Sequence, residues 1–296
     1  MPQAIGPAQK NTASGCRRQR RRQLIEVNGW RRASTMIQAG GVAILRNGSG
    51  MAWRMRMAVA RGTCCGTPLR SRERQMQTLQ VEIPVDYVKL GGILEIPDDA
   101  RAVVVFVHGS GSSRFSPRNR QVAAGLQREG FATLLFDLLT QEEQRHDELD
   151  ATYRFNIALL ARRLGATLVW LRQWADIASL PVGLFGASTG AAAALVAATE
   201  TPIVGAIVSR GGRPDLARAA LASVGAPTLL IVGELDTEVI RLNHKAAGQL
   251  TCEHRMAIVA GATHLFEEPG ALDEVTRLAA GWFGHWLCAA SSGTQA

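Results

Sequence analysis

The sequence predicts one α/β domain over residues 77–296, built on a mostly parallel central sheet with helices on both faces. Two observations predict it. Apolar segments rich in Val, Ile and Leu alternate with helical patterns from about Met76 onward, and several of those segments are apolar at nearly every position. Such segments are typical of strands buried on both faces of a parallel sheet. No apolar run approaches the ~18 residues of a transmembrane helix, so we expect no membrane association.

The strands are expected in a regular order along the chain. Two antiparallel strands open the domain, LQVEIP (79–84) and YVKLGGILEIP (87–97), with Gly91 and Gly92 marking a bulge or turn. The buried strands that follow are expected at 102–108, 132–137, 181–187, 206–210, 227–233 and 257–260. Helices are expected between them at 117–129, 155–176, 188–199, 214–224, 238–250 and 271–288. The stretch over 211–226 is long enough for one short helix but not for an inserted cap domain, which favours small, accessible substrates.

The positive charge of the chain is concentrated in residues 1–76. Lys10 and fourteen arginines against Glu26 and Glu73 give this segment a net charge of +13. The remaining residues hold 18 basic and 23 acidic side chains, a net charge of −5, so the whole chain carries +8. The overall charge therefore describes the N-terminal segment and does not indicate an acidic partner for the domain.

Residues 1–76 lack sustained apolar periodicity, which favours a disordered extension or translation from too early a start codon. Three alternatives stay open. Arg31-Arg32 before an apolar stretch resembles a twin-arginine export signal, and an Arg-rich, acid-poor segment is also typical of a transit peptide. The run CRRQRRRQ could bind nucleic acid, although no aromatic residue interleaves it. We expect no nucleic-acid binding by the domain itself.

A nucleophile elbow is predicted at Gly186-Ala187-Ser188-Thr189-Gly190, which fits G-x-S-x-G. The motif follows an apolar strand and opens a helix, which is the context that this elbow requires. Flanking glycines allow the strained turn that lifts the Ser188 hydroxyl above the sheet edge. The pattern therefore predicts Ser188 as a nucleophile.

A serine nucleophile needs a general base and an acid that orients the base. In this kind of fold the acid and then the histidine follow the serine along the chain, each after a later strand. Asp236 follows the apolar run PTLLIVG, and His264 follows AIVAGA. We therefore expect Asp236 and His264 to complete the site, with Glu234 as the alternative acid.

The oxyanion of a tetrahedral intermediate needs backbone donors. The amide of Thr189, at the start of the helix after the nucleophile, is one candidate. The second is expected from the loop His108-Gly109-Ser110-Gly111, and we assign it to Ser110 with Gly109 as its neighbour. His108 is interpreted as a structural residue that bonds this loop.

At these motifs the chain resembles the α/β-hydrolase superfamily, and within it the cap-less dienelactone hydrolase-like family. The resemblance covers about residues 77–290 and is carried by HGSG (108–111), GASTG (186–190), GELD (233–236) and GATH (261–264). It implies Ser188 as nucleophile, Asp236 as acid and His264 as base, with no cofactor or metal. The family's namesakes have cysteine at the elbow, so Ser188 favours hydrolysis of a small ester, lactone or thioester over dienelactone itself.

Arginine, histidine and cysteine residues outside these motifs are considered for substrate, metal or disulfide roles. Arg114, Arg210 and Arg213 follow strands at the same edge and could bind a substrate carboxylate, or could pair with nearby acids; the first two are kept as substrate-binding candidates. EEQRHDELD, which contains His146, is expected to be a solvated loop and not a metal site. The five cysteines show no CxxC or zinc-ligand spacing, which favours a reducing, cytoplasmic location.

Three alternatives to a hydrolase stay open. An acyltransferase would use the same nucleophile but pass the acyl group to an alcohol or amine. A catalytically silent hydrolase-fold protein would bind a ligand or partner. A nucleic-acid binder would work through residues 1–76. The sequence does not indicate an oligomeric state.

Overall fold

The computed structural model describes residues 75–288 and three short strands before them. These strands are β1 (Gln38–Ala39), β2 (Val42–Arg46) and β3 (Ala52–Arg56), which pair antiparallel in the order β1-β2-β3. The chain divides into two units, Met1–Arg70 and Ser71–Ala296. Most of residues 1–76 lies outside the described residues, so the expectation of a disordered or mis-started segment stays a prediction.

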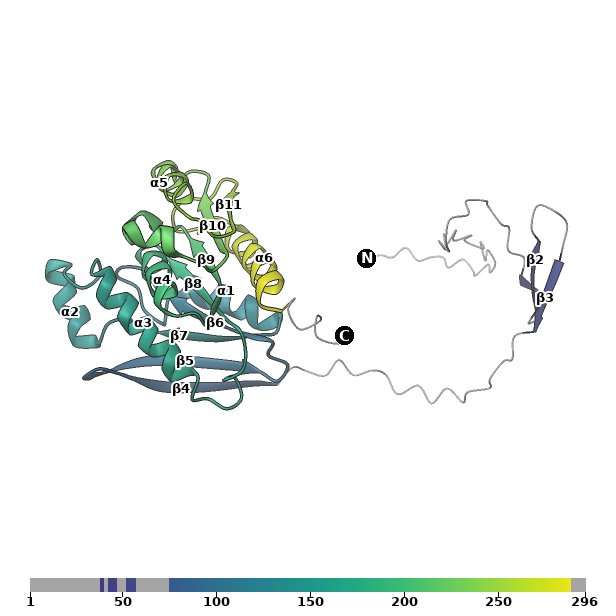
Figure 1. Ribbon diagram of the computed structural model, residues 1–296, viewed down its shortest axis with the longest axis horizontal. Coiled ribbons are helices and arrows are strands. Elements are labelled where there is room, and N and C mark those ends of the chain that lie inside the picture. Colours follow the sequence, from purple (N-terminus) through teal and green to yellow (C-terminus); the bar gives the residue numbers. More distant parts are fainter. Residues whose placement is uncertain (1–37, 40–41, 47–51, 57–74, 289–296) are drawn as a thin grey trace, which may run out of the picture. The chain divides into compact units, whose positions relative to one another are not determined.

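A single eight-stranded sheet forms the centre of the second unit (Figure 1). Its strands run along it in the order β11-β10-β9-β8-β6-β7-β5-β4. The strands β6 to β11 pair parallel, whereas β4 pairs antiparallel with β5, and β5 with β7. Their bounds are β4 (Met76–Val85), β5 (Val88–Pro97), β6 (Ala102–Val107), β7 (Phe131–Phe136), β8 (Val182–Ala187), β9 (Val204–Arg210), β10 (Thr228–Gly233) and β11 (His254–Val259). The predicted mostly parallel sheet is confirmed.

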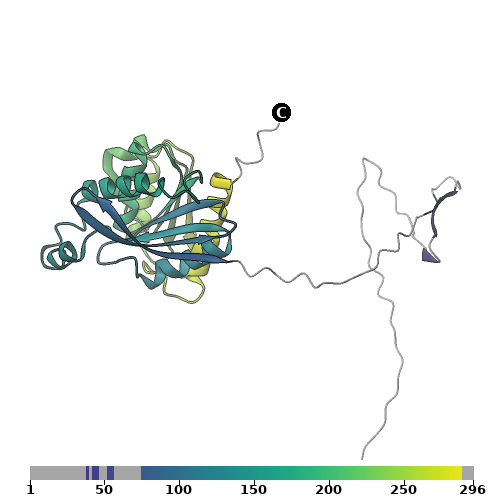
Figure 2. The same ribbon diagram turned by 90° about the horizontal axis from the view of Figure 1, so that it is seen from below.

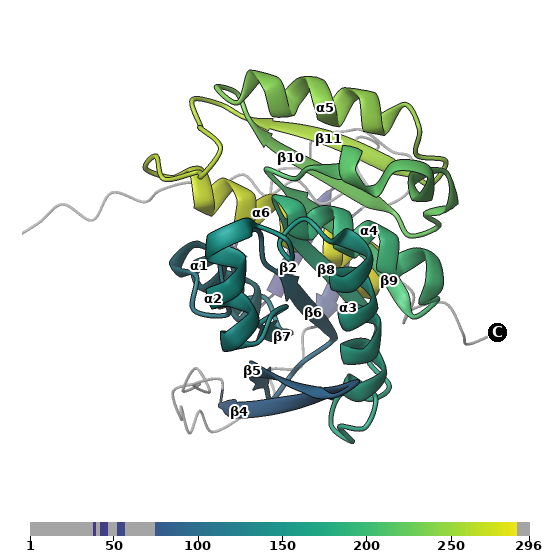
Figure 3. The same ribbon diagram turned by 90° about the vertical axis from the view of Figure 1, so that its left-hand side faces the viewer.

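Helices cover both faces of this sheet (Figures 2 and 3). Helix α1 packs with α6 on one face, and α3 packs with α4 on the other. The α-helices are α1 (Pro117–Arg128), α2 (Gln141–Asp150), α3 (Ile157–Leu171), α4 (Thr189–Glu200), α5 (Thr237–Ala247) and α6 (Ala271–Phe283). A 3₁₀ segment, η1 (Pro214–Ser223), is the only helical element between β9 and β10, and a π-helical segment, η2 (Gly284–Cys288), follows α6. No cap domain interrupts residues 75–288, as expected.

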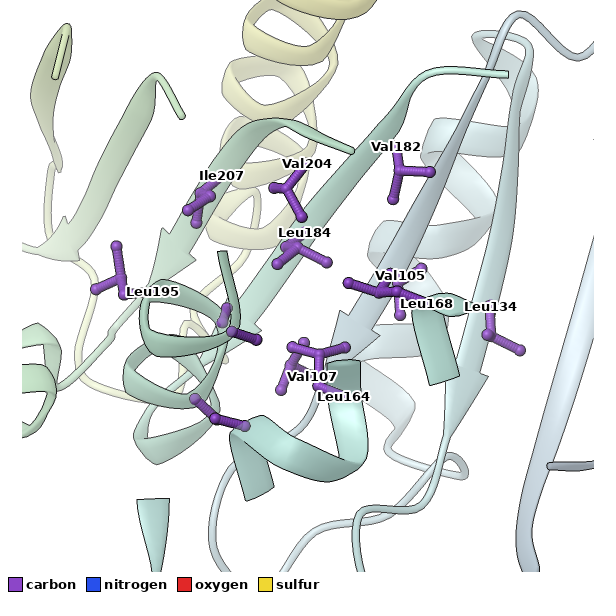
Figure 4. Close-up of a cluster of buried hydrophobic side chains, with 14 of the residues drawn as sticks. Val105, Val107, Leu134, Leu164, Leu168, Val182, Leu184, Leu195, Val204 and Ile207 are labelled. Atoms are coloured by element: carbon purple, nitrogen blue, oxygen red, sulfur yellow. The ribbon is translucent and has the colours of Figure 1, made fainter. Parts of the chain in front are cut away.

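The apolar strands are explained by burial on both faces. All six residues of β6 are buried. Val105 and Val107 face the α3 side, where Leu164 and Leu168 pack near them (Figure 4), and the intervening Phe106 belongs to the cluster on the α1 and α6 side. Successive side chains of a strand point to opposite faces, so a strand covered on both faces must be apolar throughout. Each fully buried side chain of this size contributes about 1.5–3 kcal/mol.

Gly91 and Gly92 lie inside a regular strand, so the expected bulge or turn there is wrong. They pair with Glu82 and Val81 in the uninterrupted register of β4 and β5. A Cβ atom on Gly91 would lie 2.7 Å from Nη1 of Arg114. The glycine therefore makes room for a guanidinium group against the strand.

The segment EEQRHDELD forms most of helix α2, so the expectation of a solvated loop is also wrong. Thr140 caps the helix: its hydroxyl accepts a hydrogen bond from the Glu143 amide at 3.2 Å, and Glu143 Oε2 accepts one from the Thr140 amide at 2.8 Å. This is a capping box, and its T-x-x-E signature stands in the sequence. Within residues 75–288 and the three earlier strands, no helix has the length and apolar character to cross a membrane.

Candidate active site

The sharp turn at Ser188 joins β8 to α4 at the carboxyl edge of the sheet. Ser188 adopts φ 50° and ψ −123°, a strained conformation for a residue with a side chain. A Cβ on Gly186 would lie 2.5 Å from Cα of Ala191, and one on Gly190 would overlap the carbonyl oxygens of Val107 and His108. Both motif glycines are therefore required by close backbone contacts around the elbow.

Asp236 and His264 lie in contact after β10 and β11. Nδ1 of His264 is 2.6 Å from Oδ2 of Asp236. The Asp236 side chain is 14% exposed, while that of His264 is 41% exposed. With Nδ1–H donated to the carboxylate, Nε2 is the ring nitrogen left to accept a proton. This is the arrangement expected of a general base and the acid that orients it.

The alternative acid, Glu234, is engaged elsewhere. Its Oε2 accepts a hydrogen bond from the Gly261 amide at 2.8 Å, and its own amide donates to Val259 O at 3.0 Å. These bonds tie the end of β10 to the turn after β11. Asp236 is thus the carboxylate that reaches His264.

Ser188 and His264 line one pocket of about 240 Å³. Its wall also includes residues of the loop after β6, the first turn of α1 and the end of β9. The lining residues are Gly109, Ser110, Ser112, Ser116, Arg118, Asn119, Ala187, Ser188, Arg210, Gly211, His264 and Leu265. The pocket brings together segments that are far apart in the sequence, and its size suits a small molecule.

The two expected oxyanion donors lie beside this serine. Thr189 is the first residue of α4, so its amide is outside the intrahelical hydrogen-bond pattern. The Ser110 amide donates to Oγ1 of Thr189 at 3.0 Å, and the two hydroxyls lie 3.0 Å apart. The Thr189 hydroxyl therefore holds the Ser110 amide in this structure, a contact that the sequence did not indicate.

His108 holds the loop that carries Ser110. Its Nδ1 lies 2.9 Å from Gly109 O, and its Nε2 accepts a hydrogen bond from the Leu138 amide at 3.0 Å. Both ring nitrogens are satisfied only if the ring is neutral. Burial lowers the pKa of His108, which favours that neutral form. These contacts give His108 a structural role.

The three arginines considered as substrate-binding residues differ in their ion pairs and in whether they line the pocket. Arg114 makes an ion pair with Asp137 and is not among the residues that line the pocket. Arg213 pairs with Asp215 through two hydrogen bonds of 2.9 Å. Arg210 lines the pocket and has no ion-pair partner among the described residues. The geometry therefore favours Arg210 over the other two.

Arg118 and Asn119 also line the pocket, and sequence reasoning missed them. They belong to the first turn of α1, whose N-cap Ser116 accepts a hydrogen bond from the Asn119 amide. The one feature of the sequence that could have indicated them is their position: Ser116-Pro117 starts a helix shortly after the HGSG loop. Within the described part of the chain, no three His, Cys, Asp or Glu side chains gather as a metal site would require.

Comparison with known proteins agrees with this architecture. Residues 90–282 match the family model of the dienelactone hydrolase family. The chain belongs to this family. It has the α/β-hydrolase fold that the sequence motifs implied.

One solved structure is similar to this chain in both sequence and fold. The dienelactone hydrolase of Anabaena variabilis is 56% identical, with a TM-score of 0.70, and the match covers 72% of this chain and 99% of that chain. Est1E of Butyrivibrio proteoclasticus is 16% identical with a TM-score of 0.59, covering 70% of this chain and 98% of that one. At that identity the second likeness shows the fold alone.

Two curated relatives come from strains of Mycobacterium tuberculosis and are provisionally named as phosphoribosyl transferases. Each is 53% identical over 222 residues, which is 75% of this chain and 48% of the relative. The chain thus spans about half the length of the curated relatives it matches.

Proposed function

We propose that the chain is a serine hydrolase that cleaves a small ester, lactone or thioester through Ser188, His264 and Asp236. The observation that carries the proposal is the pocket that Ser188 and His264 line together. Oδ2 of Asp236 lies 2.6 Å from Nδ1 of His264, which leaves Nε2 of the imidazole as the nitrogen that can take a proton. Membership of a hydrolase family supports the reaction class.

In the proposed reaction Ser188 Oγ attacks the substrate carbonyl while His264 Nε2 takes its proton. Asp236 holds the imidazole in the required tautomer and stabilises its cation. The amides of Thr189 and Ser110 stabilise the oxyanion, for which the Ser110 amide must share or leave its bond to the Thr189 hydroxyl. His264 then protonates the leaving group, and water attacks the acyl-enzyme to regenerate Ser188. No residue role in this scheme requires a cofactor.

The decisive experiment is hydrolysis of short p-nitrophenyl esters by the wild type and Ser188→Ala. We expect the variant to lose at least about 10³-fold in kcat. Ser113→Ala is a matched control, because Ser113 closely follows the loop 108–111 along the chain but does not line the pocket. Equal rates in wild type and Ser188→Ala would contradict the proposal.

Acyl transfer to another acceptor is the second candidate, and it uses the same acyl-enzyme. Product analysis with competing alcohols and amines separates the two, because a transferase forms new esters or amides at the expense of hydrolysis. A catalytically silent protein would show no labelling of Ser188 by a fluorophosphonate probe.

We do not extend phosphoribosyl transfer to this chain. That name belongs to relatives of which about half lies outside the match, and the matched residues belong to a hydrolase family.

The domain boundary is part of the proposal. We expect residues 77–296 to act alone, so deletion of residues 1–75 should leave ester hydrolysis intact while the net charge becomes negative. Loss of activity in a folded, truncated protein would show that the N-terminal segment contributes to the site. Cytoplasmic location stays an expectation from cysteine usage.

A further inference from the structure

Asn243 has a fully buried amide side chain that the proposed reaction does not use. It belongs to α5, the helix that begins directly after its N-cap residue Asp236, and it is 0% exposed. Helix α5 packs against β10 and η1 (Figure 3). Asn243 does not line the pocket that Ser188 and His264 share. Any effect of Asn243 on the reaction must therefore act through other residues.

The amide nitrogen of Asn243 donates to two backbone carbonyl oxygens. Nδ2 lies 2.9 Å from Gly212 O and 2.8 Å from Val239 O. Because both partners are acceptors, the NH2 group must face them. Val239 lies four residues earlier in the same helix, whereas Gly212 lies 31 residues earlier in the chain. The bond to Gly212 therefore ties α5 to the loop that ends β9.

This loop, residues 210–213, holds the backbone of Ser188. The Ser188 amide donates to Arg210 O at 3.3 Å, and the Arg213 amide donates to Ser188 O at 3.0 Å. Both backbone polar groups of Ser188 are thus bonded to the two ends of the 210–213 loop. Since Ser188 has a strained conformation with positive φ, surrounding contacts such as these must hold it there.

The 210–213 loop also lies against His264. Gly211 has a φ of +51°, and a Cβ there would lie 3.1 Å from His264 O and 3.6 Å from Cε1 of the imidazole. Cε1 is bonded to both ring nitrogens, so the place of Gly211 restricts the place of the nitrogen that takes the proton. Displacement of the loop would therefore disturb both Ser188 and His264.

Packing alone does not explain an asparagine at position 243. Its Oδ1 is buried and has no hydrogen-bond partner among the described residues, which is a cost that an apolar side chain would avoid. The loop that it holds is itself closely packed. A Cβ on Gly212 would overlap Oγ of Ser209 and lie 2.6 Å from Cβ of Ala191 in α4. The bond from Asn243 to Gly212 thus acts on a backbone segment that lies directly behind the elbow.

We propose that Asn243 is a positioning residue, which keeps Ser188 and His264 aligned by holding the 210–213 loop against the helix that follows Asp236. One amide thereby connects the helix of the acid with the segment that contacts the nucleophile and the base. A displacement of about 1 Å in such an arrangement costs roughly 10²-fold in rate. The inference rests on the proposed function, because it concerns the alignment of the groups that carry out that reaction.

The first experiment separates positioning from stability. Asn243→Ala removes both hydrogen bonds. Thr228→Ala is the matched control, because Thr228 is also 0% exposed and donates to a carbonyl oxygen, Ala226 O at 3.0 Å, but lies at the first residue of β10, the end of the strand away from Asp236. Circular dichroism verifies that both variants are folded under the assay conditions.

With p-nitrophenyl acetate, we expect kcat of Asn243→Ala to fall by about 10- to 100-fold, while KM changes by less than about threefold. Thr228→Ala should keep the wild-type kcat. An equal fall of kcat in the two variants would mean that loss of any buried hydrogen bond loosens the site, and it would overturn the proposal.

Asn243→Ser tests which of the two bonds matters. A serine hydroxyl in a helix can donate to the carbonyl oxygen four residues back, so this variant keeps a bond to Val239 O but is too short to reach Gly212 O. We expect its kcat to be as low as that of Asn243→Ala. A wild-type kcat in Asn243→Ser would show that the bond to Gly212 is not needed, and would overturn the proposal.

The rate of Ser188 labelling by a fluorophosphonate probe is a readout that a merely structural role would not move. It depends on how Ser188 and His264 are arranged in the folded protein and does not require turnover. We expect the labelling rate constant to be at least about tenfold lower in Asn243→Ala than in wild type, and unchanged in Thr228→Ala. If the alanine variant does not fold, Asn243→Ser supplies the same two measurements.

Failure of this inference can be told apart from failure of the proposed function. Wild-type kcat and labelling in Asn243→Ala, with Ser188→Ala inactive, would overturn the positioning role and leave the proposed function. Equal turnover by wild type and Ser188→Ala would overturn the proposed function, whereas slower labelling of Ser188 in Asn243→Ala would still support the positioning role.

Discussion

Nδ1 of His264 lies 2.6 Å from Oδ2 of Asp236, although 27 residues separate them in the chain. The contact depends on two adjacent parallel strands, β10 and β11, whose ends are joined by hydrogen bonds from the Glu234 amide to Val259 O and from the Leu235 amide to Ala262 O. A Cβ on Gly233 would overlap Ala262 O, so the two loops approach as closely as a glycine allows. Relative movement of the acid and the histidine is therefore restricted.

Asp236→Asn should reduce kcat for a short ester by about 10³–10⁴-fold, because the amide favours the wrong imidazole tautomer. Glu234→Gln is the matched control and should keep most activity, since glutamine can still accept the hydrogen bond from the Gly261 amide. The measurement is steady-state hydrolysis with circular dichroism to verify folding. If Glu234→Gln proved the more damaging change, Glu234 would be the orienting acid.

Gly190→Ala should lower the free energy of unfolding by about 1–3 kcal/mol or more, because its methyl group would overlap two carbonyl oxygens behind the elbow. Gly281→Ala in α6 is a useful comparison. A Cβ there meets no atom within 4 Å, so alanine should stabilise the helix by about 0.5–1 kcal/mol. Urea denaturation measures both, and opposite signs are expected. Equal stability of wild type and Gly190→Ala would contradict the packing argument.

Thr189→Val should lower kcat by about tenfold, because the Ser110 amide and hydroxyl lose the group that holds them. Thr189→Ser keeps the hydroxyl and should retain near wild-type kcat. Steady-state kinetics on one ester compares the three proteins. A higher kcat in the valine variant would show instead that the Thr189 hydroxyl competes with the substrate oxygen for the Ser110 amide.

Glu143 should make protein stability depend on pH. Burial opposes its ionisation, but hydrogen bonds from Arg163 at 2.6 and 2.7 Å and from the Thr140 amide outweigh burial and lower the pKa of Glu143. A carboxyl group with a lowered folded-state pKa stabilises the protein above its unfolded-state pKa, and this contribution is lost as the pH falls through the folded-state value.

The corresponding variant is Glu143→Gln, which should lose about 2 kcal/mol of unfolding free energy at pH 7, because the buried Arg163 is left without its anion. The difference from wild type should shrink as the pH falls through the lowered pKa of Glu143, because the wild-type carboxyl is then protonated too. Urea denaturation over pH 3–7 measures it, with Glu274→Gln, from an exposed pair with Arg277, as the control that changes little. A difference that is independent of pH would refute this assignment.

Several features followed from local patterns. Strands such as β6 were recognisable because every residue is buried between two helical layers, which leaves no polar position. The elbow was recognisable because close backbone contacts require its two glycines: Gly186 lies against the backbone of Ala191, and Gly190 lies against the carbonyl oxygens of Val107 and His108. Helix α2 was missed although Thr140 and Glu143 carried a capping signal, because its polar face gave no apolar periodicity.

The sequence by itself determined the fold class, the family and the candidate residues Ser188, Asp236 and His264, because burial, turn geometry and strand-end position leave local signals. Only the tertiary structure decided between Asp236 and Glu234, paired Arg114 with Asp137, and left Arg210 unpaired beside Asn119 and Arg118. These pairings depend on which side chains from distant parts of the chain meet at one edge of the sheet. Packing and strand register decide which side chains meet there, and no local sequence pattern records it.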